Sequence, residues 1–197
     1  MRAAALAEPR VPSFDELYAQ IERLPQGVTG EILTPGELRT MSRPASAHRH
    51  AAKRIGRILG TIDEGESTGA GWWIEIEAEI RFPRDRLAVP DLAAWRVEGV
   101  PELIDANPIR VTPDWCCEIL SPTTLRVDRL VKLPMYIDCG VETVWLVDPD
   151  QRSVEVYVAR GGLPARLAKA VDDEEVPLPP FDLPIAVGRL WLPTAPT

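Results

Sequence analysis

Alternating hydrophobic and polar residues mark most of the strands that this sequence predicts. The stretch WWIEIEAEIRF (72–82) has apolar residues on one face and three glutamates and an arginine on the other, as in a half-buried strand. LAVPDLAAWRV (87–97) predicts a second strand, which carries Asp91, and DWCCEIL (114–120) predicts a third, which carries Glu118. Later strands are expected at 143–148, 153–159 and, more weakly, about 165–170.

Helical patterns precede these strands and also occur between them. A capping box of Ser13 and Glu16 predicts a helix over 13–23, and short alternating pieces on both sides of Pro35-Gly36 then predict a hairpin. Two further helices are expected at about 47–62, capped by Ser46, and at 125–140, where Pro134 should introduce a kink because it lacks an N–H. The order of elements indicates an α/β (α+β) protein with a mixed sheet flanked by helices.

Length and composition are those of one soluble globular domain. With 197 residues, 45% hydrophobic and 26% charged, the chain can bury one sizeable core. We expect a frayed segment at 1–12, a single domain at 13–192 and a short tail at 193–197. No apolar run approaches the roughly 18 residues of a membrane helix, and the first residues do not resemble a signal peptide, so a cytoplasmic location is expected.

The cysteines argue against a disulfide framework. There are 3, an odd number, and Cys116 and Cys117 are adjacent on a predicted strand and therefore face opposite ways. Free thiols indicate a reducing compartment. With no C-x-x-C pair and only His48 and His50 as histidines, the sequence also argues against a zinc site.

Charge is distributed unevenly. The net charge of −8 argues against loose, charge-driven binding of nucleic acid. The segment 38–57, however, carries 6 Lys/Arg and 2 His with no acid, and includes Arg49 and Lys53. It is either a surface that binds anions or an ordinary solvated helix face.

Asp91 and Glu118 are the most informative polar residues. Glu118 lies in an apolar run, where an unpaired charge is unfavourable. If the strands that carry Asp91 and Glu118 are neighbours, the carboxylates can converge, and a hard cation such as Mg²⁺ would relieve their repulsion. On the following helix, Asp128, Lys132 and Tyr136 are spaced four residues apart on one face, so an ammonium could approach the pair. The alternative is an ordinary surface pair of Asp128 and Lys132.

Three blocks carry a family resemblance: GEILTPGELRTMSRPASAHRHAAKRIGRIL, VPDLAAWR and CCEILSPTTLRVDRLVKLPMYIDCGVETVWLVDPD. Over about residues 10–192 the chain resembles the bacterial Uma-two-type family of predicted endonucleases, within the restriction-endonuclease-like PD-(D/E)XK superfamily. The resemblance implies a three-layer core around a mixed sheet. It also implies that Asp91 and Glu118 are the acids of the two half-motifs, and that the Ile119 carbonyl joins them in holding Mg²⁺ or Mn²⁺.

The resemblance also implies roles for further residues. The superfamily has a lysine two residues after the second acid, where this chain has Leu120, so the role passes to Lys132. Glu37 resembles the upstream acid that helps to hold metal, with Glu31 as the competing candidate. Residues implied to contact substrate are His48, Arg49, Lys53 and Arg129, although a helix cap would also explain His48.

The leading hypothesis is a metal-dependent endonuclease that hydrolyses phosphodiester bonds in DNA. Leu120 and the net charge of −8 favour an alternative, a binding or regulatory module with the nuclease fold and no chemistry. A third hypothesis is a structural homodimer formed through exposed strands and tryptophans. Similarity of fold alone does not decide among them.

Overall fold

The computed structural model describes residues 10–42, 46–63, 71–100, 105–181 and 183–193. Its helical segments are α1 (Phe14–Ile21), α2 (Ser46–Leu59), α3 (Leu125–Val127), the π-helical turn η1 (Asp128–Lys132), α4 (Leu133–Asp138) and the 3-10 turn η2 (Val187–Leu190). Its strands are β1 (Val28–Thr34), β2 (Glu37–Ser42), β3 (Trp72–Ile76), β4 (Ile80–Phe82), β5 (Arg86–Ala88), β6 (Leu92–Arg96), β7 (Trp115–Ile119), β8 (Thr143–Asp148), β9 (Ser153–Arg160), β10 (Leu163–Val171), β11 (Glu175–Pro177) and β12 (Pro184–Ala186).

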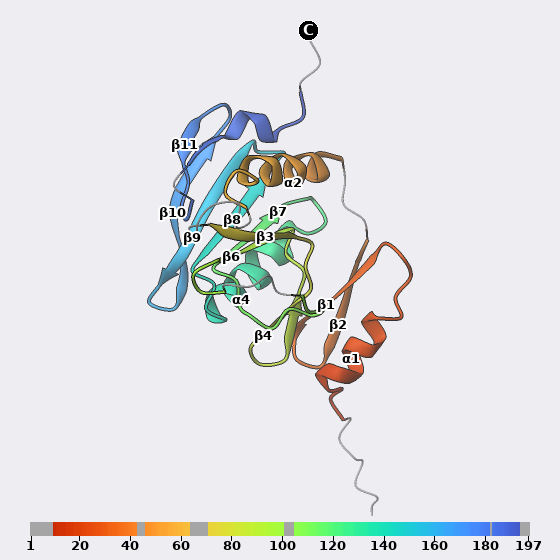
Figure 1. Ribbon diagram of the computed structural model, residues 1–197. Coiled ribbons are helices and arrows are strands. Elements are labelled where there is room, and N and C mark those ends of the chain that lie inside the picture. The colour runs from red at the N-terminus through yellow and green to blue at the C-terminus, as the bar shows by residue number, and fades with distance from the viewer. Residues whose placement is uncertain (1–9, 43–45, 64–70, 101–104, 182, 194–197) are drawn as a thin grey trace, which may run out of the picture.

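A six-stranded mixed sheet forms the centre of the molecule, in the order β10-β9-β8-β7-β6-β3. Only β7 and β8 pair in parallel; the other neighbours are antiparallel. Helix α2 lies over one face of this sheet and α4 over the other (Figure 1). The three layers and the mixed sheet expected from the sequence are confirmed.

Each face of the large sheet has its own apolar core. On the α2 side, Ala51, Ile55 and Leu59 of the helix pack on Trp115 and Trp145. The C-terminal segment that contains β11, β12 and η2 completes this core with Leu178, Phe181, Ile185, Val187, Leu190 and Trp191. On the other side, α4 packs against the sheet residues Ala93, Trp95, Cys116, Val144 and Leu146.

A smaller four-stranded sheet, in the order β2-β1-β5-β4, carries α1. The capping box at the start of α1 is confirmed: the Glu16 N–H donates to Ser13 Oγ over 3.3 Å, and the Ser13 N–H donates to Glu16 Oε2 over 2.8 Å. The hairpin around Pro35-Gly36 is confirmed as β1 and β2, with Gly36 at φ 85. Helix α2 is also present, although it ends at Leu59 rather than near residue 62.

Two long strands predicted from alternation are each broken in the middle. The stretch 72–82 divides into β3 and β4, and 87–97 divides into β5 and β6, so that each half joins a different sheet. The break arises because Glu77 adopts a left-handed conformation at φ 54, and its N–H donates to the Asp91 carbonyl over 3.2 Å. The hairpin therefore bends where the two sheets separate, and Asp91 lies at that bend.

The predicted helix over 125–140 is not one α-helix with a kink at Pro134. A π-helical turn intervenes, in which the Leu133 N–H donates to the Asp128 carbonyl, and Pro134 lies in the first turn of α4. This segment is the crossover that joins parallel strands β7 and β8. The crossover starts at the end of β7 and places Lys132 beside that end, in contact with Glu118.

Other expectations have simpler outcomes. Strands β8, β9 and β10 are confirmed, and β10 is longer than predicted. The three cysteines are free and buried. Among the described residues, no helix is both long and apolar enough to cross a membrane. Residues 1–9 of the predicted frayed segment, Arg43 of the basic segment and residues 194–197 of the predicted tail lie outside the described residues.

Candidate active site

A cavity of about 380 Å³ lies where the two sheets part. Its walls come from β1, the bend at residues 89–91, the end of β7 and the start of the crossover. The polar residues that line it are Thr29, His48, Glu77, Asp91, Glu118, Ser121, Thr123, Thr124, Asp128 and Lys132.

Asp91 and Glu118 face each other across neighbouring strands. Leu92 pairs with Cys117 and Ala93 with Cys116, so the next step of this antiparallel register sets Asp91 opposite Glu118. The ladder stops there, and Asp91 Oδ2 accepts the Ile119 N–H over 2.6 Å in place of a main-chain partner. The expectation that the two strands are neighbours is confirmed.

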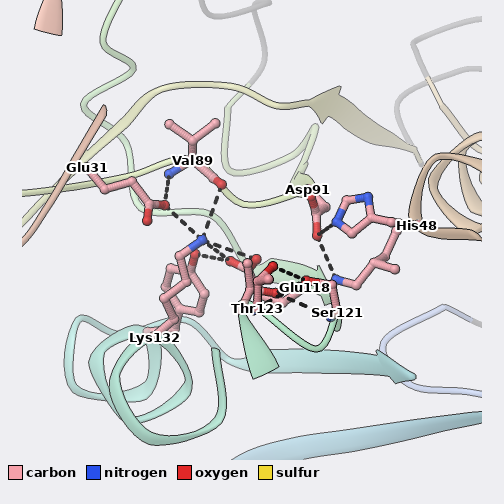
Figure 2. Close-up of polar contacts among 11 residues, drawn as sticks. Glu31, His48, Val89, Asp91, Glu118, Ser121, Thr123 and Lys132 are labelled. Atoms are coloured by element: carbon pink, nitrogen blue, oxygen red, sulfur yellow. Dashed lines mark hydrogen bonds and ion pairs between the residues drawn. The ribbon is translucent and has the colours of Figure 1, made fainter. Parts of the chain in front are cut away.

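His48 reaches Asp91 from α2. Its Nε2 lies 3.0 Å from Asp91 Oδ2, and its imidazole is 90% buried. His48 Nδ1 is buried and has no hydrogen-bond partner among the described residues. Figure 2 shows this pair beside, and separate from, the contacts of Lys132.

Lys132 is held by three groups in the buried part of the site. Its Nζ lies 2.8 Å from Glu31 Oε1, 3.1 and 3.2 Å from the two Glu118 oxygens, and 3.5 Å from the Val89 carbonyl (Figure 2). Only 1% of the residue is exposed. The alternative of a surface pair between Asp128 and Lys132 is therefore wrong, because both side chains are buried.

Tyr136 forms a further hydrogen bond with Glu118. Its hydroxyl donates to Glu118 Oε1, and the phenol is fully buried. Burial raises the pKa of Tyr136, and Glu118 raises it further, so the hydroxyl keeps its proton and acts as a donor. Burial also raises the pKa of Glu118, an effect that Lys132 opposes and the neighbouring acids reinforce.

Carboxylates outnumber cations in this cluster. Glu31, Glu118 and Asp128 are buried and Asp91 is nearly so, with Lys132 as the only lysine among them. Burial lowers the pKa of Lys132, but Glu118, Glu31 and Asp128 together raise it above its ordinary value. Burial raises the pKa of Asp128 to about 6, although Lys132 opposes the change. An added cation would relieve this excess of negative charge.

The oxygen donors fit a hard divalent cation. An ionised carboxylate offers about four lone-pair positions, and the hydrogen bonds from Lys132 and Tyr136 use three of those on Glu118. Asp91 uses only Oδ2, and its Oδ1 has no partner among the described residues. The Ile119 carbonyl belongs to the residue whose N–H donates to Asp91, so this main-chain oxygen is close to the carboxylate pair. The part of the chain that the structure describes contains no group of three or more His, Cys, Asp or Glu side chains that could hold a metal. A site here would thus consist of two carboxylates, one main-chain carbonyl and water.

Glu37 and Arg129, which have predicted roles, do not line the cavity. Glu37 is exposed beside the β1–β2 turn, whereas Glu31, three residues before the end of β1, is fully buried and binds Lys132. The geometry therefore favours Glu31 over Glu37 as the upstream acid. Arg129 does not line the cavity either; its guanidinium lies 2.6 Å from Glu155 on β9.

The remaining predicted substrate contacts lie next to the cavity. Arg49 and Lys53 are on the exposed face of α2, and with His48 they line a second cavity of about 500 Å³. Sequence reasoning missed the hydroxyl cluster at the exit of β7, where Ser121 Oγ lies 3.1 Å from Thr123 Oγ1 and 2.9 Å from Thr124 Oγ1. In the sequence, the three hydroxyl residues next to Pro122 could have indicated this cluster.

A family model matches most of the chain. The model of the Uma2 family, described as "Putative restriction endonuclease", matches residues 14–188. The chain belongs to this family. The Uma2 description supports a nuclease function and confirms the resemblance seen in the sequence. No curated protein matches the chain.

A solved structure shares the fold of this Uma2 protein. It is the crystal structure of "a putative nuclease belonging to DUF820" from Anabaena variabilis, with a TM-score of 0.68 and 21% sequence identity. The match covers 91% of this chain and 97% of that one. The single-domain mixed α/β architecture is therefore one that a known protein adopts over its whole length.

Proposed function

We propose that this protein is an endonuclease that hydrolyses phosphodiester bonds in DNA with the help of Mg²⁺ or Mn²⁺. The observation that carries the proposal is the convergence of Asp91 and Glu118 on one cavity, with Lys132 bound to Glu118. Asp91, Glu118 and the Ile119 carbonyl would hold the metal. When bound, the ion would activate a water and offset the charge of the phosphate.

The protein's own residues would prepare this site. Lys132 and Tyr136 fix the Glu118 carboxylate, so that its remaining lone pair keeps one direction. The Ile119 N–H and His48 do the same for Asp91. Such fixed groups need no reorganisation when charge develops on the phosphate, which is the main source of electrostatic catalysis. Lys132 would provide the ammonium that the superfamily's lysine provides at the position of Leu120. Leu120 itself is apolar and packs in the core beside α4.

Replacing Asp91 with asparagine tests the proposal. We expect Asp91→Asn to abolish cleavage of plasmid DNA in Mg²⁺ or Mn²⁺, because one of the two carboxylates that hold the ion loses its charge. Asp150→Asn, the same change at an exposed turn, should cleave as the wild type does. Equal cleavage by the wild type and Asp91→Asn would contradict the assignment.

A binding module without catalysis is the second candidate, favoured by Leu120 and by the tight enclosure of Lys132. Calorimetric titration with Mn²⁺ separates the two. A nuclease site should bind Mn²⁺ and lose affinity in Glu118→Gln. Failure to bind, or equal binding in the variant, would instead support the module.

A further inference from the structure

A groove between α2 and the edge strand β3 runs into the candidate active site. It has a volume of about 500 Å³, and His48 and Glu77 line both this groove and the catalytic cavity. The groove therefore adjoins the cavity at His48, which contacts Asp91 on the cavity side. Its other lining residues are Arg49, Ala52, Lys53, Gly56, Arg57, Asp63, Ile74 and Ile76.

The two walls of the groove differ in chemistry. Arg49, Lys53 and Arg57 follow one another at intervals of four residues along α2, which repeats a cation about every 6 Å. The opposite wall presents Ile74 and Ile76, of which Ile76 is 54% exposed, together with the acids Asp63 and Glu77. The row of cations suits the regularly spaced phosphates of a nucleic-acid strand, and the two isoleucines offer apolar surface to the faces of its bases.

The groove is kept open by a glycine in the middle of α2. Glycine at such a position disfavours a helix relative to alanine. A Cβ added at Gly56 would lie 3.4 Å from Ile76 Cδ1, on the opposite wall. Any side chain larger than alanine would therefore fill the space between the walls.

We propose that this groove holds one unpaired strand of DNA, so that the substrate class is single-stranded DNA or the unpaired end of a duplex. The inference rests on the proposed function, because it concerns the strand that reaches the catalytic cavity. Glu118 and Lys132 are 3% and 1% exposed, and a phosphate must enter the cavity to approach them. A single strand can follow the groove into that recess, whereas the paired strand of a duplex would meet the walls of α2 and β3.

Fluorescence anisotropy with an oligonucleotide of about 20 nucleotides, which exceeds the usual site size for single strands, tests the inference. Labelled single-stranded DNA, blunt duplex and single-stranded RNA are compared in EDTA, where metal-dependent cleavage is stopped. We expect single-stranded DNA to bind at least about tenfold more tightly than duplex, the reverse of simple attraction to charge density. Equal affinity for single-stranded RNA would also support the groove, since the two strands share the phosphate spacing.

Two variants probe the two properties of the groove separately. Lys53→Ala/Arg57→Ala should weaken single-strand binding and reduce the slope of log K against log salt by about 1.4, or about 0.7 per phosphate contact. Gly56→Met should weaken binding with the slope unchanged, because it obstructs the groove without altering charge. The matched control is Arg23→Ala/Arg160→Ala, which removes two exposed arginines outside the groove and should leave the slope unchanged.

The outcomes distinguish this inference from the proposed function. Tighter binding of duplex, or equal slopes in the Lys53/Arg57 variant and its control, would overturn the single-strand inference even if DNA is cleaved. Binding of single strands that depends on the groove, without cleavage in Mg²⁺ or Mn²⁺, would support the inference and overturn the nuclease.

Discussion

Replacing Lys132 with methionine is expected to lower the free energy of unfolding by about 3–5 kcal/mol near neutral pH, the range for removing one partner of a buried ion pair. Lys132 is the cation for Glu31 and Glu118, which are 0% and 3% exposed. Methionine fills a similar volume but leaves both carboxylates without their ammonium. The same change should abolish cleavage, because Glu118 then loses its charged partner and keeps only the hydrogen bond from Tyr136.

The loss of stability in Lys132→Met should depend on pH in a definite direction. Lys132 now opposes the rise in pKa of Glu118 and Asp128, so its removal raises both pKa values further. Acids whose pKa is higher in the folded than in the unfolded state bind extra protons as pH falls, and folding then gains stability. The difference between the variant and the wild type should therefore shrink between neutral pH and about pH 5.

Urea unfolding followed by tryptophan fluorescence measures this effect. Lys53→Met is the matched control, because Lys53 is exposed on α2 and forms no ion pair with a described residue; its effect should stay within about 0.5 kcal/mol. If Lys132→Met does not fold, Glu31→Gln/Lys132→Met should recover part of the stability by neutralising one acid. Equal stability of Lys132→Met and Lys53→Met would contradict the buried cluster.

The pairing of Asp91 with Glu118 could be predicted because it depends on short-range regularities. A period of two fixes which side chains share a strand face, and a single assumption, that the two strands are neighbours, brings the carboxylates together. The crossover starts at the end of β7, so its early residues stay close to Glu118. The spacing of Asp128, Lys132 and Tyr136 placed all three on its buried face.

What the sequence could not predict depends on contacts between distant segments. The bend at Glu77 breaks no alternation, because one left-handed residue changes the direction of a strand without changing its pattern. The choice between Glu31 and Glu37 depends on which end of the β1–β2 hairpin meets Lys132, and both lie in alternating stretches. The burial of Lys132 follows from the junction of two sheets, which becomes visible only when both are assembled.

Asp128→Asn is expected to make the protein more stable at neutral pH. Burial raises the pKa of Asp128 from 3.8 to about 6, in spite of Lys132 and the Thr124 hydroxyl. At about 1.4 kcal/mol per pKa unit, the ionised carboxylate disfavours folding by about 3 kcal/mol. An amide of the same shape carries no such penalty, so the variant should gain up to about 3 kcal/mol above pH 6.

The sign of the pH dependence identifies the cause of this gain. Between about pH 4 and 6 the folded protein holds a proton on Asp128 that the unfolded chain has released, so the stability of the wild type falls as pH rises. The advantage of Asp128→Asn should appear over this interval and vanish below about pH 4. A gain that persists at low pH would show that it comes from packing and not from the charge.

Asp138→Asn provides a control of opposite sign. Hydrogen bonds from Arg84 and Arg86 lower the pKa of Asp138, which therefore stabilises the fold above its unfolded pKa and loses that contribution as pH falls. Its asparagine variant should be less stable than the wild type at neutral pH and equal to it in acid. Urea unfolding at several pH values compares both variants with the wild type.

A buried acid that weakens the fold at neutral pH needs another reason to be present. Asp128 lines the cavity of the candidate active site and adds to the negative charge that a divalent cation would relieve. Asp128→Asn should therefore bind Mn²⁺ more weakly and cleave DNA more slowly, although it is more stable than the wild type. In Lys132→Met, by contrast, stability and cleavage should both fall. If the variant binds Mn²⁺ as the wild type does, Asp128 contributes nothing to the metal site and its burial is unexplained by function.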